Sequence, residues 1–124
     1  MIFHNKNPLI MVEGSQIDWE GHANNTEGII NEVNFDRAVK IALDFAETHP
    51  ETLVIITADH ETGGMGLNSG DIATSSLNAG YATKGHTAIP APVYAFGNGA
   101  QDFAGIYQNT EIFSKCMRLL GLER

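Results

Sequence analysis

The apolar positions of the chain fall into short runs that predict strands. Residues 9–13 form one such run, and residues 52–57 form a second that is apolar or β-branched throughout. The second run is typical of a strand buried on both faces. A third run, residues 93–96, follows Pro92 and ends at Gly97. The pattern therefore predicts at least three strands.

Other apolar residues recur at helical spacing. The clearest stripe consists of Phe35, Ala38, Val39, Ala42, Phe45 and Ala46. It predicts a helix capped by Asn34 that Pro50 prevents from continuing. A last helix is expected from Asn109 or Thr110, with Gly121 just after its end. Residues 17–23 are a candidate helix, and residues 24–28 read as a loop or helix end. Residues 63–85 are rich in Gly, Ser, Asn and Thr, and this composition predicts an irregular surface loop with a short helix at residues 72–77.

Strands that alternate with helices predict an α/β fold with a small, mainly parallel sheet flanked by helices and right-handed crossovers. The chain has 124 residues and 43% hydrophobic content, so we expect a single domain over residues 1–124 with an apolar core. Its net charge of −8 argues against a nucleic acid or an anionic membrane as partner. No stretch of about 20 apolar residues predicts a membrane span, and the amino terminus lacks the apolar core of a signal peptide.

Six potential metal ligands lie in three short stretches, and none of them is a thiolate. They are Glu13, Asp18, His22, Asp59, His60 and His86. Carboxylates combined with imidazoles suit a catalytic zinc site rather than a cysteine-rich structural one. Asp18 and His22 are four residues apart, so a helical turn would place both side chains on one face. Glu13 would end the first strand, at the edge where open α/β sheets place their sites.

Each of these residues also has an ordinary structural explanation. Asp18 could cap a helix, His22 could be a surface histidine, and Glu13 could be a solvated charge at a strand end. Asp59 and His60 are adjacent, so they can converge on one ion only if the chain has turned after the strand, which Gly63 and Gly64 allow. His86 alone would be a loop histidine. The case for a metal site therefore depends on all the stretches together.

Together these stretches resemble the carboxy-terminal part of the alkaline phosphatases, over residues 7–122. The matching motifs are Val12-Glu13-Gly14, Ile17-Asp18, Gly21-His22-Ala23-Asn24, Thr57-Ala58-Asp59-His60 and Gly85-His86-Thr87. The resemblance implies that Asp18, His22 and His86 bind one zinc, that Asp59 and His60 bind a second, and that Glu13 binds a neighbouring magnesium. It also implies hydrolysis of a phosphate monoester through a phosphoserine, with the two zinc ions flanking the ester.

The chain departs from the family pattern in two respects. The serine nucleophile and the phosphate-binding arginine of the family precede these motifs, and neither can be placed in this sequence. The chain is therefore expected to be a carboxy-terminal fragment that is inactive alone, and an open sheet edge is expected to promote a homo-oligomer. Trp19 occupies a position where many relatives carry Lys or His near the phosphate, and an indole supplies no positive charge.

Two other functions stay open at this point. One is a non-catalytic metal-binding fold, which would be stable but inert without the nucleophile. The other is another member of the wider metallophosphatase superfamily, such as a phosphodiesterase, phosphoglycerate mutase or sulfatase relative. The match around Glu13, Asp18 and His22 favours the monoesterase. By the same resemblance the complete protein is expected in the periplasm or outside the cell, although the sequence itself does not indicate a location.

Overall fold

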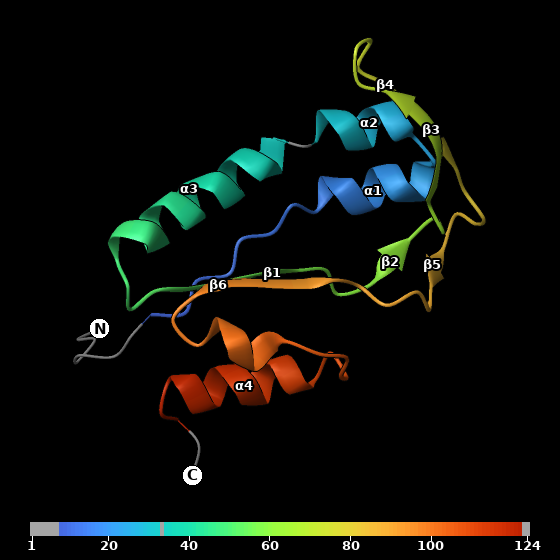
Figure 1. The fold of residues 1–124 in the computed structure, drawn as a ribbon. Coiled ribbons are helices and arrows are strands. Elements are labelled where there is room, and N and C mark those ends of the chain that lie inside the picture. The colour runs from blue at the N-terminus through green and yellow to red at the C-terminus, as the bar shows by residue number, and fades with distance from the viewer. Residues whose placement is uncertain (1–7, 33, 123–124) are drawn as a thin grey trace.

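The computed structural model describes residues 8–32 and 34–122 and shows a mixed α/β fold (Figure 1). Helices α1 to α3 lie on one side of the paired strands β1 and β6, whereas the 3₁₀ helix η1 and α4 lie on the other side. The elements in chain order are α1 (Gln16–Ala23), α2 (Thr26–Asn31), α3 (Asn34–Thr48), β1 (Leu53–Thr57), β2 (Glu61–Thr62), β3 (Gly66–Asp71), β4 (Ser76–Gly80), β5 (His86–Thr87), β6 (Val93–Gly97), η1 (Ala100–Phe103) and α4 (Glu111–Leu119).

The helices follow the apolar stripes closely. α3 and α4 occupy the predicted positions, and Gly121 adopts a left-handed φ of 66° just beyond α4. α1 matches the predicted helix and ends at Asn24, whose left-handed φ of 56° stops its continuation. Residues 24–28 were expected to be a loop or a helix end. α1 does end there, but α2 starts at Thr26, because the Asn25 side chain accepts from the backbone N–H of Gly28 at 3.2 Å and caps a new helix.

The prediction of a mainly parallel sheet is wrong. β1 pairs with β6 in antiparallel fashion, with Leu53 opposite Gly97 and Thr57 opposite Val93. The other two sheets, β2–β5 and β3–β4, are also two-stranded and antiparallel. A parallel pair needs a crossover, usually through a helix. Between β1 and β6 the structure has short strands and turns but no helix, so the chain returns in the opposite direction.

The strand predicted over residues 9–13 does not form. These residues have no regular secondary structure, and in the described part of the chain no strand pairs with them. The side chains of Met11 and Val12 are 88% and 65% exposed. A strand needs a hydrogen-bonded neighbour as well as an apolar sequence, and here the neighbour is missing. β1 has a partner, but its sheet contains only two strands in the described part of the chain, and β1 is only half-buried, which corrects the expectation of burial on both faces.

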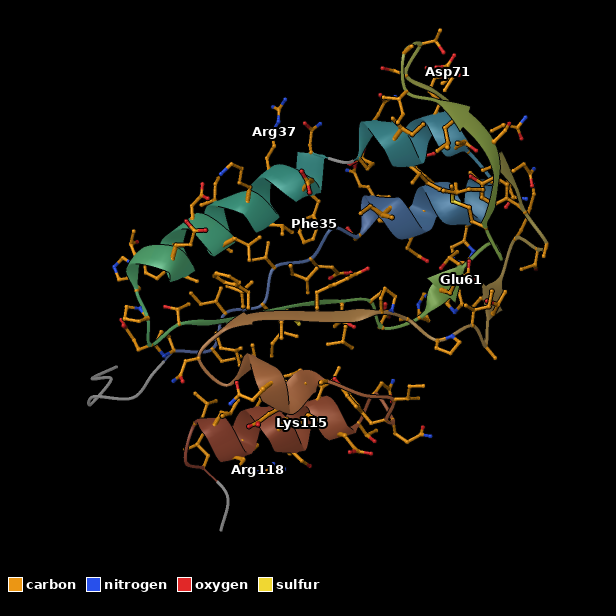
Figure 2. All side chains as sticks on the ribbon, in the orientation of Figure 1. Phe35, Arg37, Glu61, Asp71, Lys115 and Arg118 are labelled. Atoms are coloured by element: carbon orange, nitrogen blue, oxygen red, sulfur yellow. The ribbon has the colours of Figure 1, made fainter. Side chains whose placement is uncertain are left out.

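The short helix expected over residues 72–77 is replaced by the β3–β4 hairpin. Asp71 accepts a hydrogen bond from the backbone N–H of Ala73 at 2.8 Å, and Ser75 takes a left-handed φ of 53°. A side chain that bonds its own backbone two residues on favours a turn over a helix. Figure 2 shows Asp71 at the tip of this hairpin, far from α4.

The core of the described residues is small. Among large apolar side chains only that of Phe103 is buried, and Ala46 of α3 is buried with it. Lys115 joins α4 to η1, since its Nζ donates to the backbone carbonyl of Asp102 at 2.6 Å and lies 4.4 Å from the ring centre of Tyr107 (Figure 2). The described helices include none that is long and apolar enough to cross a membrane.

Candidate metal centre

Three parts of the fold bring the predicted ligands together. Asp18 and His22 lie on one face of α1, Asp59 and His60 lie in the bend after β1, and His86 opens β5. The antiparallel pairing of β2 with β5 sets Thr62 opposite His86 and so joins the second part to the third. The turn that sequence analysis assigned to the glycines is present, because Gly63 and Gly64 have φ values of 90° and 59°.

Gly63 is required by packing as well as by its backbone angle. A side chain there would come within 2.9 Å of the Tyr81 ring and 3.1 Å of the Gly21 carbonyl. The Gly63 N–H donates to the carbonyl of Gly85 at 2.9 Å, next to His86. The close approach of α1, β2 and β5 therefore depends on a residue without a side chain.

The imidazoles and carboxylates lie at short distances from one another. His22 Nε2 is 3.5 Å from Asp18 Oδ2, and His86 Nε2 is 3.9 Å from Asp18 Oδ1. The Nε2 atoms of His22 and His86 are 3.2 Å apart. The rings of His60 and His86 stack with their centres 3.6 Å apart. One ligand atom each from Asp18, His60 and His86 lie within 4.8 Å of one another.

The hydrogen bond of His22 fixes which of its nitrogens can bind a cation. His22 Nδ1 lies 2.6 Å from the carbonyl oxygen of Lys84. A carbonyl oxygen only accepts, so Nδ1 carries a proton, and in the neutral imidazole Nε2 keeps its lone pair. This lone pair points toward His86 and Asp18. Metal-ligating histidines commonly use one ring nitrogen in this way to orient the other.

Two residues that sequence analysis did not single out support the cluster. Thr62 Oγ1 donates to Asp18 Oδ1 at 2.5 Å, and this bond is the main cause that lowers the pKa of Asp18. Burial partly opposes the shift, while His22, His60 and His86 add to it. The Glu61 carboxylate accepts from the Thr87 hydroxyl and from the N–H of Met65, and both bonds lower its pKa. In the sequence, the feature that could have pointed to these two residues is their position in the polar stretch that follows β1.

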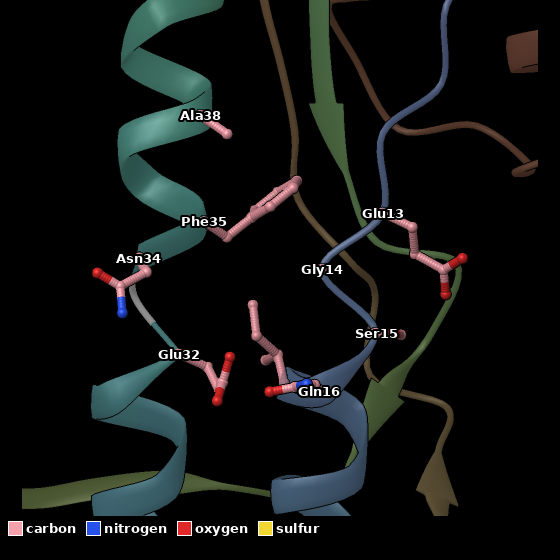
Figure 3. A pocket seen from close by; sticks show the side chains of 9 residues that line it. Glu13, Gly14, Ser15, Gln16, Glu32, Asn34, Phe35 and Ala38 are labelled. Carbon is pink, nitrogen blue, oxygen red and sulfur yellow. The ribbon is translucent and has the colours of Figure 1, made fainter.

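Two predicted ligands lie differently from the rest. Asp59 is 85% exposed, with Oδ2 3.2 Å from His60 Nε2. Glu13 is exposed, and among the described residues no contact joins it to the cluster. It borders a groove of about 370 Å³ between the start of α1 and α3, where Phe35 lies against Gly14 and the Glu13 side chain points away from Phe35 (Figure 3).

The donor set suits a cation. Imidazole nitrogens and carboxylate oxygens converge, and their lone pairs repel one another unless a positive charge, either a proton or a metal ion, lies among them. Nitrogen and oxygen donors without a thiolate fit zinc in an open site, and oxygen donors such as Glu13 fit magnesium. The trio of Asp18, His60 and His86 combines residues that the resemblance assigns to two different zinc ions.

Comparison with known proteins gives one consistent result. The family model described as alkaline phosphatase matches residues 4–79. Streptomycin-6-phosphate phosphatase of Streptomyces griseus is 37% identical over 92% of this chain and 29% of its own length. Alkaline phosphatase 3 of Bacillus subtilis is 28% identical over 90% of this chain and 40% of its own length. The chain thus spans well under half the length of these relatives.

The solved structures agree with the sequence relatives. The alkaline phosphatase of the Antarctic bacterium TAB5 is 44% identical, with a TM-score of 0.81 over 90% of this chain and 34% of that one. A variant of the TAB5 protein is described with magnesium bound in its M3 site. The fold described above therefore corresponds to about a third of that structure.

Proposed function

The chain belongs to the alkaline phosphatase family, and on that premise we propose that it contributes metal ligands to the hydrolysis of phosphate monoesters. In this proposal Asp18, His22 and His86 bind a first zinc, Asp59 and His60 contribute to a second zinc, and Glu13 contributes to a magnesium site. The observation that supports it best is the 3.2 Å approach of the Nε2 atoms of His22 and His86 beside the Asp18 carboxylate.

Each residue has a defined task in this proposal. The Asp18 carboxylate supplies negative charge, and the Lys84 carbonyl holds the His22 ring so that Nε2 faces the site. His60 stacks on His86, which holds the two imidazoles against each other beside the β2–β5 pair. Zinc bound by these groups would supply Lewis acidity toward the oxygens of a phosphate ester. The bound cation would also make the charge at the site positive in a chain whose net charge is −8.

We further infer that this chain alone hydrolyses phosphate monoesters poorly. The family reaction needs a positioned serine and a cation that holds the phosphate, and groups that act as a unit fail together. Ser69, Ser75 and Ser76 lie on the β3–β4 hairpin and Ser114 lies on α4. Within the described residues no serine hydroxyl is hydrogen-bonded to the ligand cluster. The rest of the family site would have to come from residues outside those described.

Occupancy should differ among the three sites. Asp18, His22 and His86 provide three protein ligands, which together with water is the usual open zinc arrangement. A cation that binds to only one or two protein ligands loses nearly as much hydration as at a three-ligand site but gains fewer bonds to the protein. Magnesium in particular gives up its water ligands reluctantly. We therefore expect one tightly held zinc and weak binding at the Asp59–His60 and Glu13 sites. A well-ordered magnesium at Glu13 in a crystal of this chain alone would contradict this expectation.

Zinc uptake by single-histidine variants tests the ligand assignment. In equilibrium dialysis the unsubstituted chain is expected to bind one zinc, and His22→Ala is expected to lose it while His60→Ala largely retains it. His49→Ala is the matched control, because His49 stacks on Phe45 at the end of α3 and is not part of the ligand cluster. Loss in His60→Ala with retention in His22→Ala would replace the assigned trio by Asp18, His60 and His86. Equal uptake by all the variants would refute the site.

A homo-oligomer and an exported location are further parts of the proposal. Strand β3 of the hairpin is exposed along its length, and Leu67 presents a 68% exposed side chain on it. Open hairpin edges of this kind pair with other chains. Family membership favours a complete protein in the periplasm or outside the cell. Fractionation of the source cells with an antibody against this chain tests the location, and recovery with cytoplasmic markers would contradict it.

A further inference from the structure

Thr62 occupies the point where the three ligand-bearing parts of the fold meet. It lies on β2, directly opposite His86 on β5. Its side chain also packs against α1, because a Cβ built on Gly21 would lie 3.1 Å from Thr62 Cβ and Cγ2. Gly21 follows Asp18 by three residues and therefore shares its face of the helix. Thr62 thus contacts α1 through both its methyl and its hydroxyl group.

The hydroxyl of Thr62 connects two ligands. A hydroxyl has one hydrogen, and here it is donated to Asp18 Oδ1 at 2.5 Å. The same oxygen lies 3.2 Å from His60 Nδ1, so in that contact it can only accept. His60 Nδ1 must therefore carry a proton, and in the neutral imidazole this leaves the lone pair on Nε2. Nε2 lies 3.2 Å from Asp59 Oδ2, a contact that either a proton or a bound cation stabilises.

We propose that Thr62 is a positioning residue that orients the Asp18 carboxylate and holds His60 in its Nδ1–H tautomer for metal binding. This role rests on the proposed function. Asp18 and His60 are assigned to different zinc ions, so one hydroxyl couples the ligand sets of both. The position of Thr62 is itself fixed by its register with His86 and by the contact with Gly21. Removing the hydroxyl should therefore affect the site without removing a ligand.

Two substitutions separate the hydroxyl from the packing of the side chain. Thr62→Val keeps the volume and the methyl contact with Gly21 but removes the hydroxyl. Thr62→Ser keeps the hydroxyl and removes the methyl. Zinc affinity is measured by competition with a chromogenic chelator. The tautomer of His60 is measured in the metal-free protein by long-range proton–nitrogen NMR at a pH where the imidazoles are neutral.

We expect Thr62→Val to weaken zinc binding by about 10–100-fold, as for other groups that orient metal ligands, and to abolish the preference of His60 for the Nδ1–H tautomer. Thr62→Ser should stay close to the unsubstituted chain in both measurements. Equal affinity and an unchanged tautomer in Thr62→Val would overturn the proposal. An equal loss in both variants would also overturn it, because packing rather than the hydroxyl would then be responsible. If the unsubstituted chain takes up no zinc, the metal site itself is refuted, and the tautomer comparison alone decides the role of Thr62.

Discussion

The Gly21→Ala substitution tests whether α1 must approach β2 as closely as the structure shows. Gly21 is buried inside α1, and a methyl group there would lie 3.1 Å from two carbon atoms of Thr62. Alanine stabilises a helix interior by about 1 kcal/mol relative to glycine. Overpacking costs about 1–3 kcal/mol. The two effects oppose each other, so we expect a variant that is less stable by up to about 2 kcal/mol.

Metal binding should respond more strongly than stability. The added methyl has to displace Thr62 by a few tenths of an ångström, and this movement weakens the 2.5 Å hydrogen bond to Asp18. We expect zinc affinity to fall roughly tenfold. Stability is measured by urea unfolding in the presence of a chelator and followed through Trp19, the one tryptophan of the chain, which is 64% exposed and adjoins Asp18. Zinc affinity is measured separately by competition with a chromogenic chelator.

Gly28→Ala is the matched control. Gly28 also lies within a helix, but a methyl there would meet the carboxylate end of the Glu20 side chain and the amide of Asn25. Both groups are flexible and can rotate away, so zinc affinity should stay unchanged. The reasoning would be refuted if Gly21→Ala gained the full helix-propensity stabilisation and bound zinc as tightly as the unsubstituted chain.

Four further outcomes are expected. In a chromogenic monoester assay at alkaline pH with zinc and magnesium, the chain alone should show little turnover; rapid turnover that Asp59→Ala abolishes would contradict the expected inactivity. The pKa of Glu61 is lowered from its ordinary value of 4.5, so its carboxylate favours folding above that pH and this contribution is lost as the pH falls. With a chelator present, the urea midpoint of unfolding should therefore fall less at acid pH in Glu61→Gln than in the unsubstituted chain. Identical pH profiles of the two proteins would exclude this role of Glu61. Gly97 has a φ of 96°, and a Cβ there would clash with the carbonyl of Thr52. Gly97→Ala should therefore lower the free energy of unfolding by at least about 2 kcal/mol. A loss below about 0.5 kcal/mol would show that the backbone adjusts. Leu67→Lys on β3 should reduce self-association in sedimentation velocity, and a monomeric unsubstituted chain at all concentrations would exclude this interface.

Helices α1, α3 and α4, and the placement of Asp18 and His22 on one helix face, were predictable because they depend on local spacing. The separation of Asp18 and His22 by one helical turn requires only that residues 16–23 form a helix, as they do in α1. His86 has no local signal of its own, and it was identified only because its motif occurs in order with the others. The glycines after His60 were correctly expected to turn the chain.

The sheet and the supporting residues were not predictable in the same way. The direction of β6 depends on what the chain does between residues 57 and 93, and apolar patterning does not specify this path. The apolar run at residues 9–13 has the sequence of a strand, but a strand also requires a partner that the described residues do not provide. Thr62 and Glu61 gain their importance from two-residue strands whose pairing is set by tertiary contacts.

The shortness of β2 and β5 has a consequence for local motion. Each contains two residues, and a ladder of that length is too small to resist opening by itself. Asp18 and His22 lie on α1 and His86 starts β5, so a zinc held by these three residues would act as a crosslink that closes the long loop between the helix and the strand. Amide hydrogen exchange at Gly63, whose N–H donates to the Gly85 carbonyl, should then be fast in chelator and slow in zinc. In this region the metal would hold the two strands in place as well as act as a Lewis acid.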